Sequence, residues 1–377
     1  MQIETFELER QQSLYENRVS YNLTESGVHP FTLKELLGRD EIESLLDIRL
    51  GYGQTNGSID LRRNIAALYS DRTEENVLVT SGSSEANFVA MHTLLEPGDE
   101  ILYMVPNYLQ IWGLAKSMGV RVQTFSLKEE LNWQPDIAEI QEKVSEKTKM
   151  IVICNPNNPT GSVLNKESIT RIINLADNVN AYLYADEVYR GAELDGKETV
   201  SMLDLYDKTV VSGGLSKAYA LPGLRIGWLT GPSDIIASCW SHRDYTSISS
   251  GLLSQYIAEY ALHPEKRDSI LERNRSILRE NLEFLINWNE QQDHLFAFQS
   301  PKAGGMVYMK YQMDISSNEL TDRLRKEKSV FLVPGEHFGM DHYLRLGIGA
   351  NQEYLKEGLQ RFSKFLKEIN GEGGKKI

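Results

Sequence analysis

Lys217 is the residue whose surroundings most suggest chemistry. It lies in SGGLSKAYALPGLRIGW, residues 212–228, where nearly every neighbour is small or apolar and Arg225 follows eight positions later. Burial beside another positive charge disfavours the protonated amine, and the neutral amine is the form that attacks a carbonyl. We therefore expect Lys217 to be a nucleophile whose pKa is lowered by burial and by Arg225. The alternative is a lysine whose stem packs while its ammonium reaches water.

A second segment could hold a phosphate. In VTSGSSEANF, residues 79–88, an apolar strand runs into Gly82, Ser83 and Ser84 and a helix starts at once. Small residues let backbone N–H groups converge, and a helix N-terminus attracts anions. The alternative is an ordinary serine cap, which is common at any helix start.

Two further apolar strands end in polar residues. ICNPNNPTGS, residues 153–162, predicts a rigid loop in which the amide of Asn158 could donate to a ligand oxygen. YADEVYRG, residues 184–191, places Asp186 and Tyr189 at a strand end, where open α/β proteins bind ligands. A tight turn and a helix cap are the respective alternatives. In combination, four strand ends offer a phosphate cradle, an amide, a carboxylate and an amine.

Alternating short apolar runs and amphipathic helical stretches predict an α/β fold with a mainly parallel sheet flanked by helices. After a helical pattern from about 264 to 289, three apolar segments flank one further helical stretch, and this pattern indicates a smaller α+β layer. We expect a large domain over 46–285 and a discontinuous small domain over 1–45 and 286–377. The strands are expected within 76–82, 100–108, 149–156, 181–187, 208–214 and 224–231, and in the smaller layer within 303–311, 330–338 and 342–349.

Composition narrows the class of protein. The 377 residues are 41% hydrophobic and 25% charged, which suits a globular protein with a substantial core. A formal net charge of −13 disfavours nucleic-acid binding and leaves a small molecule or a protein as partner. Cys154 and Cys239 are the only cysteines, so neither a disulfide framework nor a cysteine metal site is expected. With no apolar run long enough to span a membrane and no signal-like N-terminus, we expect a cytoplasmic protein.

The motifs YGQTNGSIDLR, SGSSEAN, NPNNPTG, DEVY, SKAYALPGLRIG and YLRLGIG occur in this order over nearly the whole chain. Together they resemble a fold-type I pyridoxal phosphate (PLP)-dependent aminotransferase of class I/II, in the aspartate aminotransferase superfamily. The resemblance implies an enzyme that moves an amino group between an L-amino acid and a 2-oxo acid. Lys217 would carry PLP as an internal aldimine and later serve as the base that moves the α-proton.

The resemblance also assigns the surrounding residues. Asp186 would pair with the pyridinium nitrogen, and Tyr189 and Asn158 would hydrogen-bond the ring hydroxyl oxygen, with Asn158 also near the substrate. Tyr108 would stack on the ring. Arg345 would clamp the substrate carboxylate, with Gly27 near it, and Tyr52 would cross the interface of a homodimer with shared active sites. The phosphate would be bound by Gly82, Ser83, Ser84, Ser216 and Arg225.

Two features depart from the aminotransferase pattern. Gly214 stands where many relatives have a Ser or Thr that touches the phosphate, so Ser212 or Ser216 would substitute. The stretch SGVHPFT replaces the usual Gly and Pro-Asp-Phe and resembles capreomycidine synthase, as does RDYTSIS at 243–249. His29 could then face the substrate, although a lone His beside Pro is more often a surface or packing residue.

The reaction therefore stays open within the fold. A PLP lyase or cyclase is the nearest alternative, because cofactor residues do not select the reaction. A regulatory binding module is disfavoured by the negative charge and by the absence of a basic N-terminal domain. The sequence does not identify the amino donor or acceptor.

Overall fold

The computed structural model describes residues 3–373 and is built on an eight-stranded sheet. The five strands β3, β4, β6, β7 and β8 run parallel, while β9 is antiparallel to both β8 and β2. Strand β2 therefore points the same way as β8, and its carboxyl end lies at the same edge. The spatial order is β2 (Val77–Thr80), β9 (Gly227–Thr230), β8 (Thr209–Gly214), β7 (Tyr182–Asp186), β6 (Thr148–Cys154), β3 (Glu100–Val105), β4 (Arg121–Lys128) and β5 (Gln134–Pro135).

Helices cover both faces of this sheet, which explains why its central strands are apolar throughout. Successive strand residues point to opposite faces, so Leu78 and Val210 join one buried cluster while Val79 and Val211 join the other. Ile236 of α9 packs in the first cluster, on the face that also holds α5 and α6. The helices along this part of the chain are α4 (Ile59–Ala66), α5 (Ser83–Leu94), α6 (Gln110–Ser117), α7 (Ile137–Lys143), α8 (Lys166–Asn178), α9 (Ser233–Arg243) and α10 (Leu252–Ala261).

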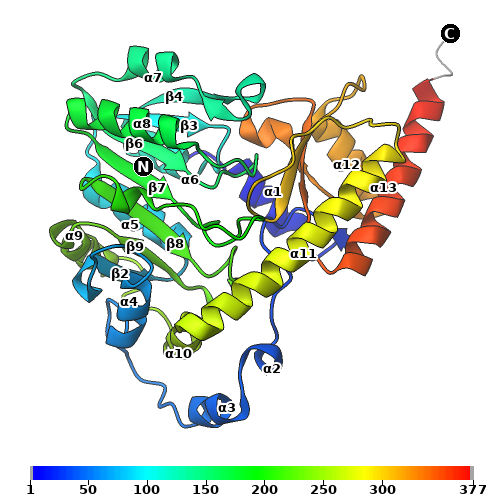
Figure 1. The fold of residues 1–377 in the computed structure, drawn as a ribbon. Coiled ribbons are helices and arrows are strands. Elements are labelled where there is room, and N and C mark those ends of the chain that lie inside the picture. The colour runs from blue at the N-terminus through cyan, green and yellow to red at the C-terminus, as the bar shows by residue number, and fades with distance from the viewer. Residues whose placement is uncertain (1–2, 374–377) are drawn as a thin grey trace.

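The C-terminal part forms a smaller antiparallel sheet. Its order is β10 (Met306–Lys310), β13 (Tyr343–Gly347) and β12 (Val333–Pro334), accompanied by α12 (Ser317–Lys328) and α13 (Gln352–Gly373). The N-terminal strand β1 (Tyr21–Asn22) pairs in parallel with β11 (Val330–Phe331), so the N-terminal segment joins the smaller layer here. The long helix α11 (Pro264–Glu290) runs from the large sheet to this smaller layer (Figure 1).

Helix α1 (Glu7–Tyr15) lies between the large sheet and the smaller layer (Figure 1). On one side the Phe6 ring packs edge-on against Tyr108 with centroids 4.8 Å apart. On the other, the Arg325 guanidinium lies 3.7 Å from the centre of the Tyr15 ring. The segment around α1 therefore touches both parts of the molecule.

The predicted fold class is confirmed, and each predicted strand range contains a strand. The strand β4 was missed because RVQTFSLK alternates polar residues and is only partly buried. The range 330–338 holds two short strands and a 3₁₀ turn instead of one strand. The domain boundaries stay a prediction. No helix within residues 3–373 combines the length and apolar character that a bilayer crossing requires.

Candidate active site

The four strand ends singled out in the sequence meet at one edge of the large sheet. Asp186 is the last residue of β7, and Lys217 follows β8 by three residues. Between them lies a cavity of about 370 Å³. Ten of the predicted site residues line it: Ser83, Ser84, Tyr108, Asn158, Asp186, Tyr189, Ser216, Lys217, Arg225 and Arg345.

One end of the cavity is strongly electropositive. Gly82 precedes α5 with a φ of 87°, and no side chain caps the N–H groups that start this helix. The Arg225 guanidinium lies so close that a Cβ on Gly82 would be 2.5 Å from Nη2. Within residues 3–373, Arg225 forms no ion pair, and its Nη1 donates only to neutral oxygens of Ser216 (3.4 Å) and Pro222 (3.2 Å). A helix N-terminus and a guanidinium placed together fit a phosphate dianion.

Gly214 stands where many relatives have a Ser or Thr, and the geometry favours Ser216 over Ser212 as its substitute. Ser216 lines the cavity beside Arg225, whereas Ser212 is fully buried within β8 and is not among the lining residues.

Asp186 lies at the buried end of the cavity. The Val188 backbone N–H donates to its Oδ1 at 3.2 Å. Burial raises the pKa of Asp186 to about 6, although the Val188 hydrogen bond and the charge of Lys217 oppose the rise. A carboxyl group held in this way gains a partner when a protonated ring nitrogen approaches it. Its environment therefore fits the pyridinium of PLP.

Asn158 and Arg345 act as a connected pair. Nη1 of Arg345 donates to Oδ1 of Asn158 at 2.9 Å, and Nη2 donates to the Thr24 carbonyl at 2.7 Å. The Asn158 oxygen is thus occupied, which leaves its Nδ2 as the donor for a ligand. The Arg345 side chain is 2% exposed, and its Nε has no partner among the described residues. An incompletely paired buried guanidinium is suited to a carboxylate.

Tyr189 faces the same cavity with its hydroxyl protonated. It shares a hydrogen bond of 2.8 Å with Ser26 Oγ. Burial raises the pKa of Tyr189 to about 12, so the hydroxyl remains a donor at neutral pH.

The prediction that burial and the like charge of Arg225 lower the pKa of Lys217 was wrong. Its Nζ donates to Oε1 of Glu25 at 2.6 Å, and Arg225 is not among the groups that shift its pKa. Burial pushes the pKa of Lys217 down, but the negative charge of Glu25 outweighs burial and the pKa is raised. The Lys217 charge in turn holds the pKa of Glu25 down to about 2. In this structure Lys217 is therefore an ammonium in an ion pair.

Helix α1 and Glu16, the residue directly after it, contribute side chains that the motifs did not reveal. Glu9, Gln12 and Glu16 line the cavity and follow the i, i+3, i+7 spacing of one helical face. Tyr108 Oη donates to Glu9 Oε1 at 2.8 Å, and Gln12 Nε2 donates to Thr24 Oγ1 at 2.9 Å. The helical spacing was available in the sequence, but the acidic face reads equally well as a solvated one.

Four predicted residues are not among those that line the cavity. Gly27 packs against the backbone of Ser216, a residue of the cavity wall, since a Cβ on Gly27 would lie 3.1 Å from the Ser216 carbonyl oxygen. Gly82 shapes the phosphate end without lining it. Tyr52 is 88% exposed. His29 is exposed, and its contacts are made by the backbone, with its N–H donating to the Gly349 carbonyl at 2.7 Å.

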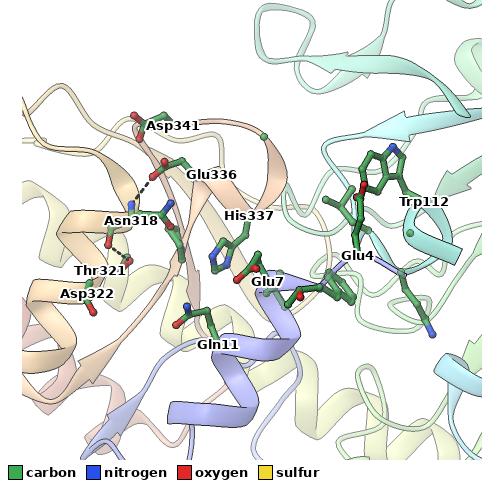
Figure 2. Close-up of a pocket in the computed structure, with 18 of the residues that line it drawn as sticks. Glu4, Glu7, Gln11, Trp112, Asn318, Thr321, Asp322, Glu336, His337 and Asp341 are labelled. Atoms are coloured by element: carbon green, nitrogen blue, oxygen red, sulfur yellow. Dashed lines mark hydrogen bonds between the residues drawn. The ribbon is translucent and has the colours of Figure 1, made fainter. Parts of the chain in front are cut away.

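A larger cavity of about 890 Å³ lies on the other side of α1. Glu7 and Gln11 of α1 line it together with His337, Asn318 and Asp322 of the smaller layer (Figure 2). The described residues that line this cavity include no lysine and none of the predicted catalytic residues. The smaller cavity is therefore the candidate active site.

Comparison with known proteins agrees with this arrangement. The chain is 28% identical to capreomycidine synthase of Streptomyces vinaceus over 352 residues (92% of this chain, 89% of the relative). It is 29% identical to an aspartate aminotransferase of Thermotoga maritima over 356 residues (92% and 91%).

Solved structures show the same fold. A PLP-dependent aminotransferase from Streptococcus suis 89-1591 superposes with a TM-score of 0.92 at 34% identity, covering 98% of this chain and 99% of that one. The PLP-dependent cyclase OrfR superposes with a TM-score of 0.89 at 25% identity, covering 98% of each chain. The family "Aminotransferase class I and II" matches residues 34–362. The chain therefore belongs to the class I and II aminotransferases, a family of PLP-dependent enzymes.

Proposed function

We propose that this protein transfers an amino group from an L-amino acid to a 2-oxo acid, using PLP attached to Lys217. The observation that carries the proposal is the shared cavity, which Lys217, Asp186 and Arg225 all line. Asp186 supplies a carboxylate at the end of β7, and Lys217 supplies an amine after β8. Arg225, just before the start of β9, supplies an anion site.

The lining residues account for each part of the cofactor. The N-terminus of α5 and Arg225 would hold the phosphate, with Ser216 beside them. Asp186 would keep a proton on the ring nitrogen, and Tyr189 and Asn158 Nδ2 would donate to the ring hydroxyl oxygen. When bound, PLP supplies an aldehyde that condenses with amines and a ring that withdraws electrons. The ring of Tyr108 would stack over it.

Lys217 would then work as a base. When it is not attached to the cofactor, its Nζ would be free to accept the substrate α-proton and then to donate that proton to a neighbouring carbon atom of the cofactor. To do so, Nζ must lose the proton that Glu25 stabilises. Arg345 would fix the substrate carboxylate, and this positioning makes proton removal an intramolecular step.

A homodimer with shared sites is part of the proposal. Helix α3 (Arg39–Leu46) has no buried residue and projects away from the body of the chain, next to α2 (Leu33–Leu36) (Figure 1). Exposed apolar side chains lie at its end and after it, with Leu46 78%, Leu50 81% and Tyr52 88% exposed. A surface of this kind is typical of an interface. Tyr52 would extend from it toward the partner's phosphate. The cytoplasmic location also remains a prediction.

A PLP-dependent cyclase or lyase is the second candidate. It is favoured by the similarity to capreomycidine synthase and to the cyclase OrfR. The same fold and cofactor residues serve these reactions, so they do not decide between the two.

Incubation of the PLP-loaded protein with single amino acids separates the candidates. Transfer predicts accumulation of pyridoxamine phosphate and of the matching 2-oxo acid, and its reversal when a second 2-oxo acid is added. Release of ammonia or of a cyclised product, with the cofactor remaining PLP, would instead support the second candidate.

A further inference from the structure

Negative charge gathers on one wall of the candidate active site. Glu9 and Glu16, at one face and the end of α1, line the cavity together with Glu25. The pKa of Glu16 is raised, first by burial and then by the negative charges of Glu25 and Glu9. Glu16 is therefore close enough to the other two carboxylates to be repelled by both.

Few positive charges are left to balance them. The cations that line the cavity are Lys217, Arg225 and Arg345. In the proposed function, phosphate occupies Arg225, the substrate carboxylate occupies Arg345, and Lys217 gives up its ammonium. Asp186 is matched by the ring nitrogen. The described lining residues then hold no further cation for Glu9, Glu16 and Glu25. Arg345 remains close enough for its charge to act on Glu9 and Glu25.

The anion-binding group of the site is Arg345, which lies close enough to Glu9 and Glu25 for their charges to act on it. Arg345 is 2% exposed, and its Nε has no partner within residues 3–373. An incompletely satisfied buried guanidinium indicates an anionic ligand group, for which an α-carboxylate is suited. The site therefore combines the guanidinium groups of Arg345 and Arg225 with several carboxylates on one wall.

We propose that the amino acid accepted here has a side chain that ends in a positive charge, which Glu9 and Glu16 bind. This inference rests on the proposed function, since it assigns the substrate class of the same site. Carboxylates pair with a guanidinium or an ammonium, and Gln12 between them can accept a further hydrogen bond. A substrate with a second carboxylate would meet like charge at this wall.

Binding of matched pairs of amino acids tests the inference. The probes are L-arginine with its neutral counterpart L-citrulline, L-lysine with L-norleucine, and L-glutamate. Calorimetry is performed on the holoenzyme after borohydride reduction, so that bound PLP cannot react. We expect each cationic probe to bind at least about tenfold more tightly than its neutral counterpart, as a charge-assisted hydrogen bond predicts.

Charge-removing variants locate the effect. The double variant Glu9→Gln, Glu16→Gln should lose about tenfold or more of the affinity for L-arginine while its affinity for L-citrulline stays the same. Glu7→Gln is the matched control, because Glu7 lies on the same helix but lines the larger cavity. It should leave both affinities unchanged.

Equal binding of charged and neutral probes overturns the inference, as does tighter binding of L-glutamate or loss of L-arginine affinity in the control alone. If no probe binds, the inference is also wrong. The proposed function fails separately, if borohydride fixes no PLP on the protein or if no amino acid converts PLP to pyridoxamine phosphate.

Discussion

Lys217 and Glu25 form an ion pair, with 2.6 Å between Nζ and Oε1. The partners are separated by 192 residues, and Glu25 belongs to the N-terminal segment that leads from β1 into the site. The contact therefore links the candidate nucleophile to the part of the chain that carries the acidic wall. The negative charge of Glu25 also raises the pKa of Lys217 and so favours the protonated amine.

Glu25→Gln should make attachment of PLP easier at low pH. Glu25 raises the pKa of Lys217, so its removal lowers that pKa and lets the neutral amine form at lower pH. The rate at which visible absorbance develops after PLP is mixed with apoprotein, followed from pH 6 to 10 (about the range between the ordinary His and Lys pKa values), should have a midpoint shifted toward acid. A profile identical to that of the wild type would show that Glu25 does not control the amine. Glu7→Gln serves as the control.

Arg225→Gln should weaken cofactor retention through the phosphate. Loss of a charge-assisted hydrogen bond at the start of α5 should raise the Kd of PLP by about tenfold or more. Equilibrium dialysis measures this, and pyridoxal, which lacks the phosphate, provides the comparison. Its affinity should change little. An equal loss for both ligands would mean that Arg225 supports the fold and not the phosphate.

Asp186→Asn should leave PLP attached but slow proton removal. The neutral amide cannot stabilise a proton on the ring nitrogen, and loss of one such electrostatic contribution costs on the order of 100-fold in rate. Stopped-flow spectroscopy of the half-reaction with an amino acid isolates this step. A rate equal to that of the wild type would exclude Asp186 as the partner of the ring nitrogen.

The sequence predicted those parts of the site that follow strands. Asp186, Asn158 and Lys217 stand directly after apolar runs, and parallel strands bring their carboxyl ends to one edge. The short-range pattern was therefore enough to place these side chains together.

The short-range sequence pattern did not place Glu25 or the residues of α1 in the site. The Lys217–Glu25 pair depends on how the N-terminal segment folds back onto the large sheet, and no local spacing encodes that distance. Glu9 and Glu16 repeat at helical spacing, but a solvated helix would show the same pattern. Strand β4 was missed for a related reason, because a partly exposed strand does not need a continuous apolar run.

The most direct test of the account is to locate the covalent bond to PLP. Holoprotein reduced with borohydride and digested with protease should show the added mass of the reduced cofactor on the peptide that contains Lys217. Lys217→Ala should show no aldimine absorbance band once unbound PLP has been removed. An unmodified Lys217 peptide, or added mass on a different lysine, would contradict the account.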